Sequence, residues 1–132
     1  MTSTTPALTG ITTVAIPVSD QDAARRLFEQ LGFATVFDAD LGGGFRWVDL
    51  ATAGGGCRLS LVRSGEGLPT GIDTGIRFTT SDARAAHATV TALGLEVGEL
   101  LDWETAPLMF SFCDADGNRL YVSQSEEDRR PS

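Results

Sequence analysis

The chain has 132 residues and a mass of 14.0 kDa, the size of one domain, which excludes a multidomain machine. Its 18 acidic and 10 basic residues give a net charge of −8, which argues against nucleic acid and anionic membranes as partners. Apolar residues make up 42% of the chain and charged residues 21%, a composition typical of globular proteins rather than disordered ones.

The first ten residues are polar and rich in Ser and Thr, without the basic start and apolar run of a secretory signal. No stretch approaches the roughly 20 apolar residues that span a bilayer. We therefore expect a cytoplasmic protein. In that reducing compartment the two cysteines, Cys57 and Cys113, are expected to pack as small hydrophobic residues.

The sequence repeats itself at an offset of 62 residues. The shift aligns Val14-Ala15-Ile16 with Ile76-Arg77-Phe78, Ser19-Asp20 with Ser81-Asp82, and Leu31-Gly32-Phe33 with Leu93-Gly94-Leu95. Because the matches run in order through strand, cap, helix and stop signals, the two halves are interpreted as copies of one module.

Each copy begins with a strand in which apolar residues alternate with others, as in residues 13–18. Ser19 or Asp20 then caps a helix that ends at Gly32, and Ser81 or Asp82 caps a second helix that ends at Gly94. The remaining predicted strands cover residues 33–38, 45–51 and 57–62 in the first copy, and 96–101, 108–113 and 119–123 in the second.

These elements predict one α+β domain made of two tandem βαβββ modules. The predicted boundaries are a flexible N-terminus (1–10), the first module (11–62), a linker rich in Gly and Pro (63–72), the second module (73–124) and a flexible charged tail (125–132).

The opening motif Val14-Ala15-Ile16-Pro17-Val18-Ser19-Asp20 and the closing motif Asp114-Ala115-Asp116-Gly117-Asn118-Arg119-Leu120 carry a resemblance to a known family. Two βαβββ modules with these motifs resemble the vicinal oxygen chelate superfamily, which includes glyoxalase I, extradiol dioxygenases and bleomycin-resistance proteins. The resemblance implies cup-shaped mixed sheets with helices on the outer face, and it implies a homodimer. Ala115 stands where the family motif has Pro, a change that relaxes a turn.

Enzymes of that superfamily hold a divalent metal with His or Glu at four positions. Carried over to this chain, those positions are Thr13, Ser60, Gly75 and Tyr121, none of which is a usual metal ligand. His87, the single histidine, matches Arg25 of the first copy and is interpreted as a solvent-facing helix residue. We therefore expect no metal and no other cofactor.

Strand alternation predicts which residues line the cup. If Val14 and Ile16 pack on the first helix, residues of the opposite parity face the concave side, and Trp103 and Phe112 close its rim. The expected ligand-binding residues are Thr13, Phe45, Trp47, Asp49, Ser60, Gly75, Arg77, Trp103, Phe112 and Tyr121. No catalytic residue is assigned.

An aromatic lining suits a flat or amphipathic ligand, and the acidic charge favours a cationic one. The resemblance to the metal-free bleomycin-resistance branch implies a binding protein that sequesters an aromatic or cationic natural product, for antibiotic self-resistance or to carry an intermediate. One alternative is a metal-independent biosynthetic enzyme (isomerase, lyase or cyclase) with Asp49 or Tyr121 as acid or base and Arg77 stabilising an oxyanion. The other is a divalent-metal glyoxalase or dioxygenase with an atypical site.

Overall fold

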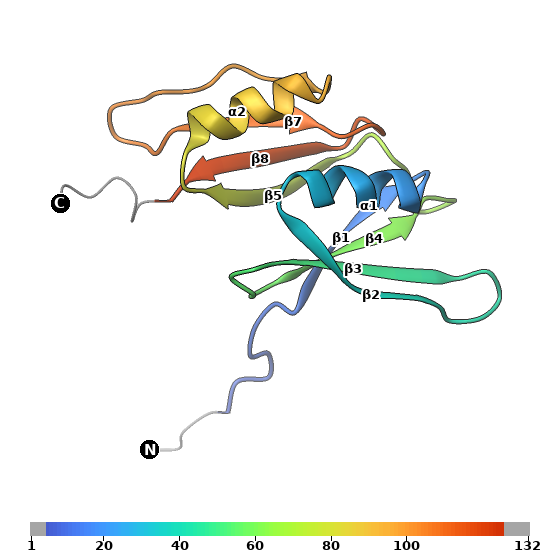
Figure 1. Ribbon diagram of the computed structural model, residues 1–132. Helices are drawn as coiled ribbons and strands as arrows, with labels where there is room; N and C mark the ends of the chain where they lie inside the picture. Colours follow the sequence, from blue (N-terminus) through green and yellow to red (C-terminus); the bar gives the residue numbers. More distant parts are fainter. Residues whose placement is uncertain (1–4, 126–132) are drawn as a thin grey trace.

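The computed structural model describes residues 5–125, which form two helices and eight strands (Figure 1). In chain order the elements are β1 (Thr13–Val18), α1 (Gln21–Gln30), β2 (Phe33–Asp40), β3 (Arg46–Thr52), β4 (Arg58–Arg63), β5 (Asp73–Thr80), α2 (Ala83–Ala92), β6 (Glu96–Val97), β7 (Met109–Cys113) and β8 (Arg119–Gln124).

The strands form two four-stranded mixed sheets of identical topology, which confirms the tandem βαβββ modules. The first sheet has the order β1-β4-β3-β2 and the second the order β5-β8-β7-β6. In each sheet the first and last strands of the module run parallel, whereas the other neighbours are antiparallel. One helix lies across one face of each sheet (Figure 1). We call the other face of each sheet its open face.

The helix boundaries follow the capping signals of the sequence. The Asp20 carboxylate accepts a hydrogen bond from the Ala23 amide at 3.0 Å, and Asp82 caps α2 in the same way. Both helices end before a glycine with positive φ, namely Gly32 at +108° and Gly94 at +80°. Since glycine reaches such angles without a steric penalty, the repeated glycine ends each helix at the equivalent place.

The core lies between the sheets and their helices and continues from one module into the other. Phe28 of α1 is fully buried, and its ring meets Phe33 at 5.8 Å and Phe78 of β5 at 6.1 Å between centroids, both edge to face. Phe78 belongs to the second module, so this aromatic cluster joins the two repeats by burial of apolar surface.

A buried asparagine in the closing turn also joins the modules. Asn118 has no exposed surface, and its side-chain Nδ2 donates to the Pro17 carbonyl at 2.7 Å and to Asp114 Oδ2 at 3.0 Å. Its Oδ1 accepts from the Gly71 amide at 2.9 Å and the Ile72 amide at 3.2 Å. One side chain therefore ties β1, the linker and the β7–β8 turn together.

The neighbouring aspartates of this turn have different partners. Asp114 accepts from the backbone amides of Asp116 and Asn118, as expected for an acidic turn residue, and burial raises the pKa of its carboxyl. Asp116 instead reaches the other module, where its carboxylate accepts from the Ser19 amide at 3.0 Å and from the Ser19 hydroxyl. Asp114 therefore stabilises its own turn, whereas Asp116 links that turn to the first module.

Three sequence expectations about the fold differ from the structure. Cys57 is exposed rather than packed as a small hydrophobic residue, whereas Cys113 is buried as expected. The strand expected at 96–101 is limited to Glu96–Val97, with an isolated bridge from Leu101 to Met109. His87 is half-buried rather than fully solvent-facing: its Nε2 lies 2.9 Å from the Gly98 carbonyl oxygen, and its ring packs edge to face on Phe110 at 5.0 Å. The segment after α2 folds back over the helix and covers this residue, which periodicity alone does not reveal.

The expected flexible ends, 1–10 and 125–132, lie largely outside the described residues, since 1–4 and 126–132 are not described. Within the described part, neither helix has the length and apolar character needed to cross a membrane.

We predict that Asn118→Ala lowers the free energy of unfolding by about 3 kcal/mol, because it removes four hydrogen bonds of a fully buried side chain, with the Pro17 carbonyl, the Gly71 and Ile72 amides and Asp114. Urea denaturation followed by circular dichroism measures the change. The control is Ser19→Ala, which removes an exposed hydrogen bond to Asp116 and is expected to cost about 1 kcal/mol or less. Equal, small losses in both variants would contradict the role assigned to Asn118.

Candidate functional site on the open faces

Half of the expected ligand-binding residues gather on the open face of the first sheet. Val48 and Leu50 are fully buried beneath the helix, so the alternate residues of β3 point to the other side. The pairing of β3 with β4 sets Asp49 opposite Ser60. The residues that this sheet brings to its open face are Thr13, Phe45, Trp47, Asp49 and Ser60.

A chain of polar groups crosses this face at its buried centre. The Ser60 hydroxyl has no exposed surface and donates to Asp49 Oδ1 at 2.5 Å, and Asp49 is 8% exposed. Thr13 Oγ1 lies 3.0 Å from Ser60 Oγ and 3.2 Å from the Arg58 carbonyl oxygen. The Ser60 hydroxyl proton points to Asp49, so the single hydroxyl proton of Thr13 is shared between the Arg58 carbonyl oxygen and Ser60 Oγ.

Asp49, the acidic residue of this polar network, has Arg58 as a distant cationic partner. Arg58 Nη1 lies 3.6 Å from Asp49 Oδ2, beyond hydrogen-bonding distance, and the Arg58 side chain is 49% exposed. Sequence reasoning did not select Arg58, although it has the same strand parity as Ser60. The network therefore presents a guanidinium at the surface above a buried carboxylate.

Two aromatic side chains cover the end of the sheet next to this network. Phe45 and Trp47 have ring centroids 6.0 Å apart at an interplanar angle of 36°, and Phe45 is 48% exposed. Such a pair offers a partly exposed apolar surface on which a flat molecule can stack.

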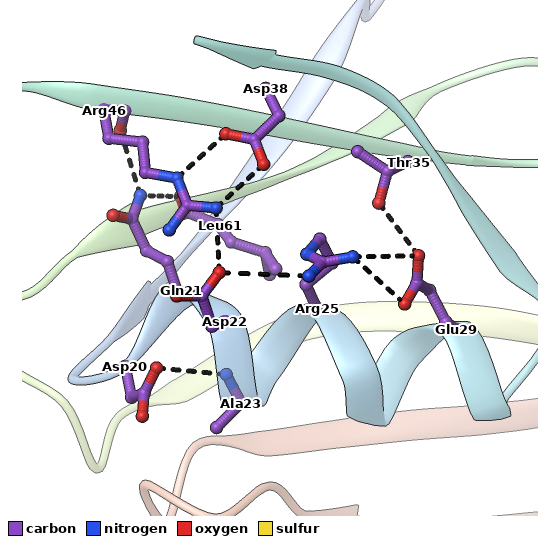
Figure 2. Close-up of polar contacts among 10 residues, drawn as sticks. All are labelled: Asp20, Gln21, Asp22, Ala23, Arg25, Glu29, Thr35, Asp38, Arg46 and Leu61. Carbon is purple, nitrogen blue, oxygen red and sulfur yellow. Dashed lines mark hydrogen bonds and ion pairs between the residues drawn. The ribbon is translucent and has the colours of Figure 1, made fainter. Parts of the chain in front are cut away.

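Arg46, between the two aromatic residues, points to the helix side and anchors the β2–β3 hairpin (Figure 2). Its guanidinium donates to both Asp38 oxygens at 2.8 Å and to Asp22 of α1 at 2.9 Å, and these bonds hold the pKa of both carboxyls below the usual range. The Gln21 side chain adds bonds to the Arg46 and Leu61 carbonyls. The hairpin is thereby fixed to α1, which sets the position of the aromatic pair.

The open face of the second sheet carries a different group of residues. The Tyr121 hydroxyl donates to Asp73 Oδ2 at 2.7 Å, and the Arg77 guanidinium carbon lies 4.4 Å from the Tyr121 ring centroid. Gly75, between Asp73 and Arg77, has φ +68° in an irregular part of β5. The sequence analysis did not select Asp73, because this residue directly follows the predicted linker. Its alternate position relative to Gly75 and Arg77 along the strand was the signal that could have found it.

The bond between Tyr121 and Asp73 changes the acid–base properties of both groups. It lowers the pKa of Asp73 and raises the pKa of Tyr121, because the bond stabilises the carboxylate with the neutral phenol. Tyr121 is thus a poor base and a weak acid near neutral pH. Its hydroxyl proton is engaged in the hydrogen bond to Asp73.

The remaining two expected site residues lie apart from both groups. Trp103 is 58% exposed in the connection between β6 and β7. Phe112 is 2% exposed and packs in the core beneath α2, on the face of the sheet opposite Tyr121. Phe112 therefore does not form part of either open face.

The residues at the four family metal positions do not fit a metal ion. The Thr13 and Ser60 hydroxyls are hydrogen-bonded to each other, Gly75 has no side chain, and the Tyr121 hydroxyl is bonded to Asp73. Within residues 5–125 no group of three or more His, Cys, Asp or Glu side chains is placed to hold an ion. This donor set lacks the anionic and imidazole ligands that a divalent ion requires.

A cavity of about 950 Å³ lies between the modules, away from the aromatic pair. Its walls come from the start of β1, the end of α1, strand β5 and helix α2. Of the expected site residues, Gly75, Arg77 and Phe112 line it. We call this cavity the inter-module groove; sequence reasoning did not foresee it, because it exists only where the two repeats meet.

Comparison with protein families gives a match over residues 10–122 to the model of the Glyoxalase/Bleomycin resistance protein/Dioxygenase superfamily. No curated protein sequence matches the chain closely enough to report.

Several solved structures share the fold. TnmS3, an antibiotic binding protein from Streptomyces sp. CB03234, is 28% identical with a TM-score of 0.79, covering 91% of this chain and 98% of TnmS3. A superfamily member from Sphaerobacter thermophilus is 27% identical with a TM-score of 0.81, covering 89% and 98% of the two chains. A bleomycin-binding protein solved in complex with bleomycin is 19% identical with a TM-score of 0.62, covering 89% and 99%; this likeness shows the fold alone.

We predict that Asp73→Asn lowers the pKa of Tyr121 toward its ordinary value of 10.0, because the negative acceptor that disfavours phenolate is removed. The chain contains one tyrosine, so ultraviolet absorbance of phenolate during alkaline titration reports Tyr121 alone. The control is Asp102→Asn, a remote exposed carboxylate, which should leave the midpoint unchanged.

The same bond predicts the pH range in which it stabilises the fold. The lowered pKa of Asp73 means that the contribution is present above 3.8 and is lost as pH falls through the lowered value. The raised pKa of Tyr121 means that it is present below 10.0 and is lost as pH rises through the raised value. A stability difference between wild type and Tyr121→Phe that persisted unchanged outside this window would contradict the assignment.

Proposed function

Because this chain belongs to the Glyoxalase/Bleomycin resistance protein/Dioxygenase superfamily, we propose that it is a metal-independent protein that binds and sequesters an aromatic or cationic natural product. The observation that carries the proposal is that the residues at the family metal positions are hydrogen-bonded to neighbouring side chains or, at Gly75, have no side chain. Thr13 and Ser60 are engaged with each other, at 3.0 Å between their oxygens, and Tyr121 with Asp73 at 2.7 Å. The face that holds a metal in the enzymes is here a satisfied polar surface.

The aromatic pair supports a flat ligand. Phe45 and Trp47 stand beside the polar network on the open face, fixed from behind by the bonds of Arg46. A rigid, partly exposed aromatic surface binds a ring at low entropic cost, because few side-chain rotamers are lost. The similarity to TnmS3, an antibiotic binding protein, also supports an antibiotic or a related compound as the ligand.

The charge distribution supports a cationic group on the ligand. Asp49 is a buried carboxylate on the open face, and its pairing with Arg58 is loose at 3.6 Å. A ligand cation that displaced the exposed Arg58 side chain could approach Asp49 more closely than Arg58 does. The net charge of −8 adds long-range attraction, screened over about 8–10 Å at physiological salt.

The enzymatic alternative has less support from the same residues. Tyr121, its candidate acid or base, has a raised pKa because its hydroxyl donates to Asp73. Asp49, the other candidate, already accepts a hydrogen bond from the Ser60 hydroxyl. A general acid or base must exchange a proton with the substrate near the working pH, and neither group is free to do so without breaking a bond.

A homodimer in the cytoplasm is part of the proposal. In the described chain β1 is an edge of the first sheet and β5 an edge of the second, and unpaired edges favour association with another strand. A second copy that pairs with these edges would extend the sheets of both chains.

We predict that Trp47→Ala weakens binding of metal-free bleomycin, or of another aromatic antibiotic that binds the wild type, about tenfold, because one of the two stacking rings is lost. Isothermal titration calorimetry measures the affinity, and the unfolding midpoint should shift little. Leu41→Ala, an exposed apolar residue of the same hairpin outside the aromatic pair, is the matched control. An equal loss of stability and affinity in Trp47→Ala would place Trp47 in the core instead.

Ligand recovered from the complex distinguishes sequestration from turnover. We expect chromatography and mass spectrometry to return the compound unchanged after prolonged incubation; a new product would favour the enzyme.

Treatment with a chelator should leave binding unaltered, since the donor groups present do not fit a metal ion. Elemental analysis of protein purified without chelator is expected to find less than one equivalent of any divalent ion. A full equivalent of zinc, nickel, iron or manganese, or loss of binding after its removal, would overturn metal independence.

A further inference from the structure

A β-bulge in β2 brings a further aromatic residue to the open face of the first sheet. The pairing of β2 with β3 shifts between Thr35 and Phe37, so Val36 is an extra residue in the strand. Thr35 and Asp38 both lie on the helix side, bonded to side chains of α1 and β3 (Figure 2). Phe37 is paired with Asp49 and therefore lies on the open face. Strict alternation from Thr35 assigns Phe37 to the helix side, which is why the sequence analysis did not select it.

Phe37 remains uncovered in this position. Its side chain is 42% exposed, and Phe45 on the same face is 48% exposed. β2 is the edge of the first sheet opposite β1, so these rings are remote from the strand edges at which a second copy is expected to pair. Exposed apolar side chains that gather on one face mark a binding surface.

Asp49, beside Phe37, has one carboxylate oxygen without a close partner. Its Oδ1 accepts from the Ser60 hydroxyl, whereas within residues 5–125 no hydrogen bond reaches its Oδ2. The contact of Oδ2 with Arg58 is 3.6 Å long, and the Arg58 side chain is 49% exposed. Since a charge-assisted hydrogen bond measures about 2.7–2.9 Å, this oxygen retains capacity for a closer cation.

The spacing of these side chains sets where a ligand must carry its charge. Directly paired residues have Cβ atoms about 4.5–5.5 Å apart, so Phe37 and Asp49 are near neighbours. Trp47 lies two residues from Asp49 on the same strand, roughly 7 Å away on the same face. A ring stacked on either aromatic side chain therefore brings its own atoms close to the carboxylate. A charge within that ring is close to Asp49, whereas a charge on a long arm extends past it.

We propose that the open face of the first sheet selects an aromatic cation, a flat heterocycle whose positive charge is delocalised over the ring. Phe37 and the aromatic pair hold the ring by stacking and cation–π attraction, and its charge lies beside Asp49. Arg58 is an internal cation that stays near the carboxylate until the ligand displaces it. This inference rests on the function proposed above and narrows its ligand, aromatic or cationic, to a compound that is both.

The test compares 10-methylacridinium with acridine, which have the same three fused rings. At about pH 8 the first is a permanent cation and the second is uncharged. Isothermal titration calorimetry on the full chain is expected to give one methylacridinium site per chain, with an affinity at least tenfold above that of acridine. Part of this preference comes from the net charge of −8, so raised salt should reduce it without removing it.

The variant Arg58→Gln removes the internal cation and should strengthen binding. We expect the affinity for 10-methylacridinium to rise about threefold and the affinity for acridine to stay within twofold, since an exposed ion pair is weak. The control is Arg84→Gln, which makes the same change of net charge at an exposed arginine of α2 and should alter neither affinity.

The variant Asp49→Asn keeps an acceptor for the Ser60 hydroxyl and removes the negative charge. It should weaken 10-methylacridinium about tenfold and leave acridine within twofold. Asp102→Asn makes the same change of net charge at a remote exposed carboxylate and should leave both affinities unchanged. Circular dichroism and thermal unfolding verify that each variant folds.

The variant Phe37→Leu keeps an apolar side chain and removes the aromatic face. We expect it to weaken 10-methylacridinium about fivefold and acridine less, because only the cation gains from the ring quadrupole. The unfolding midpoint should change little, since Phe37 is 42% exposed. Unchanged affinity for the cation would remove Phe37 from the site.

These outcomes separate the inference from the function proposed above. If the wild type binds an aromatic antibiotic but binds the two probes equally, or binds neither probe, the function stands and selection of aromatic cations is overturned. A preference for the cation that persists in Asp49→Asn overturns recognition by this face. Weaker cation binding in Arg58→Gln shows that Arg58 holds the ligand instead of competing with it, and overturns its role as an internal cation. Absence of both antibiotic and probe binding overturns both proposals.

Discussion

The side chain of Asn118 is the constraint on which the arrangement of the two repeats depends. It is fully buried and makes four hydrogen bonds, to Pro17 of β1, to the linker amides of Gly71 and Ile72, and to Asp114 of its own turn. A buried amide with fewer partners would be strongly unfavourable. Of these four bonds, the one to Pro17 crosses to the first module. Together with the bonds of Asp116 to Ser19 and the contact of Phe28 with Phe78, it holds the second module docked on the end of β1.

The docking leaves the open faces of the two sheets free and creates the groove between them. The helix faces of both sheets are used for the core, where Phe28 of one module meets Phe78 of the other. The open faces are left for polar and aromatic residues, and the gap between the docked modules becomes the inter-module groove. A single βαβββ module has an open face but no groove, because the groove needs walls from both repeats.

The polar residues of the open faces mostly satisfy one another. The Ser60 hydroxyl donates a hydrogen bond to Asp49, the Thr13 and Ser60 hydroxyls are hydrogen-bonded to each other, and the Tyr121 hydroxyl donates to Asp73. Charge is nevertheless available at the surface, since Arg58 and Arg77 are held by weak or stacking contacts rather than by close carboxylates. Such a surface recognises shape and charge well, whereas proton transfer would require bonds of the fold to be broken. This is the physical basis for preferring binding over catalysis.

The sequence by itself determined the elements and their faces. Alternation predicted that Trp47 and Asp49 share one face of their strand, and the burial of Val48 and Leu50 on the other face agrees with it. The capping residues and glycines located both helices, because these signals act between residues close in the chain. Only the tertiary structure decided that Phe112 lies in the core, that His87 is covered, and that Tyr121 gives its proton to Asp73. The same holds for the bond from Asn118 to Pro17, whose partners are 101 residues apart. Contacts at such separations leave no periodic trace in the sequence, since they depend on how the finished modules pack.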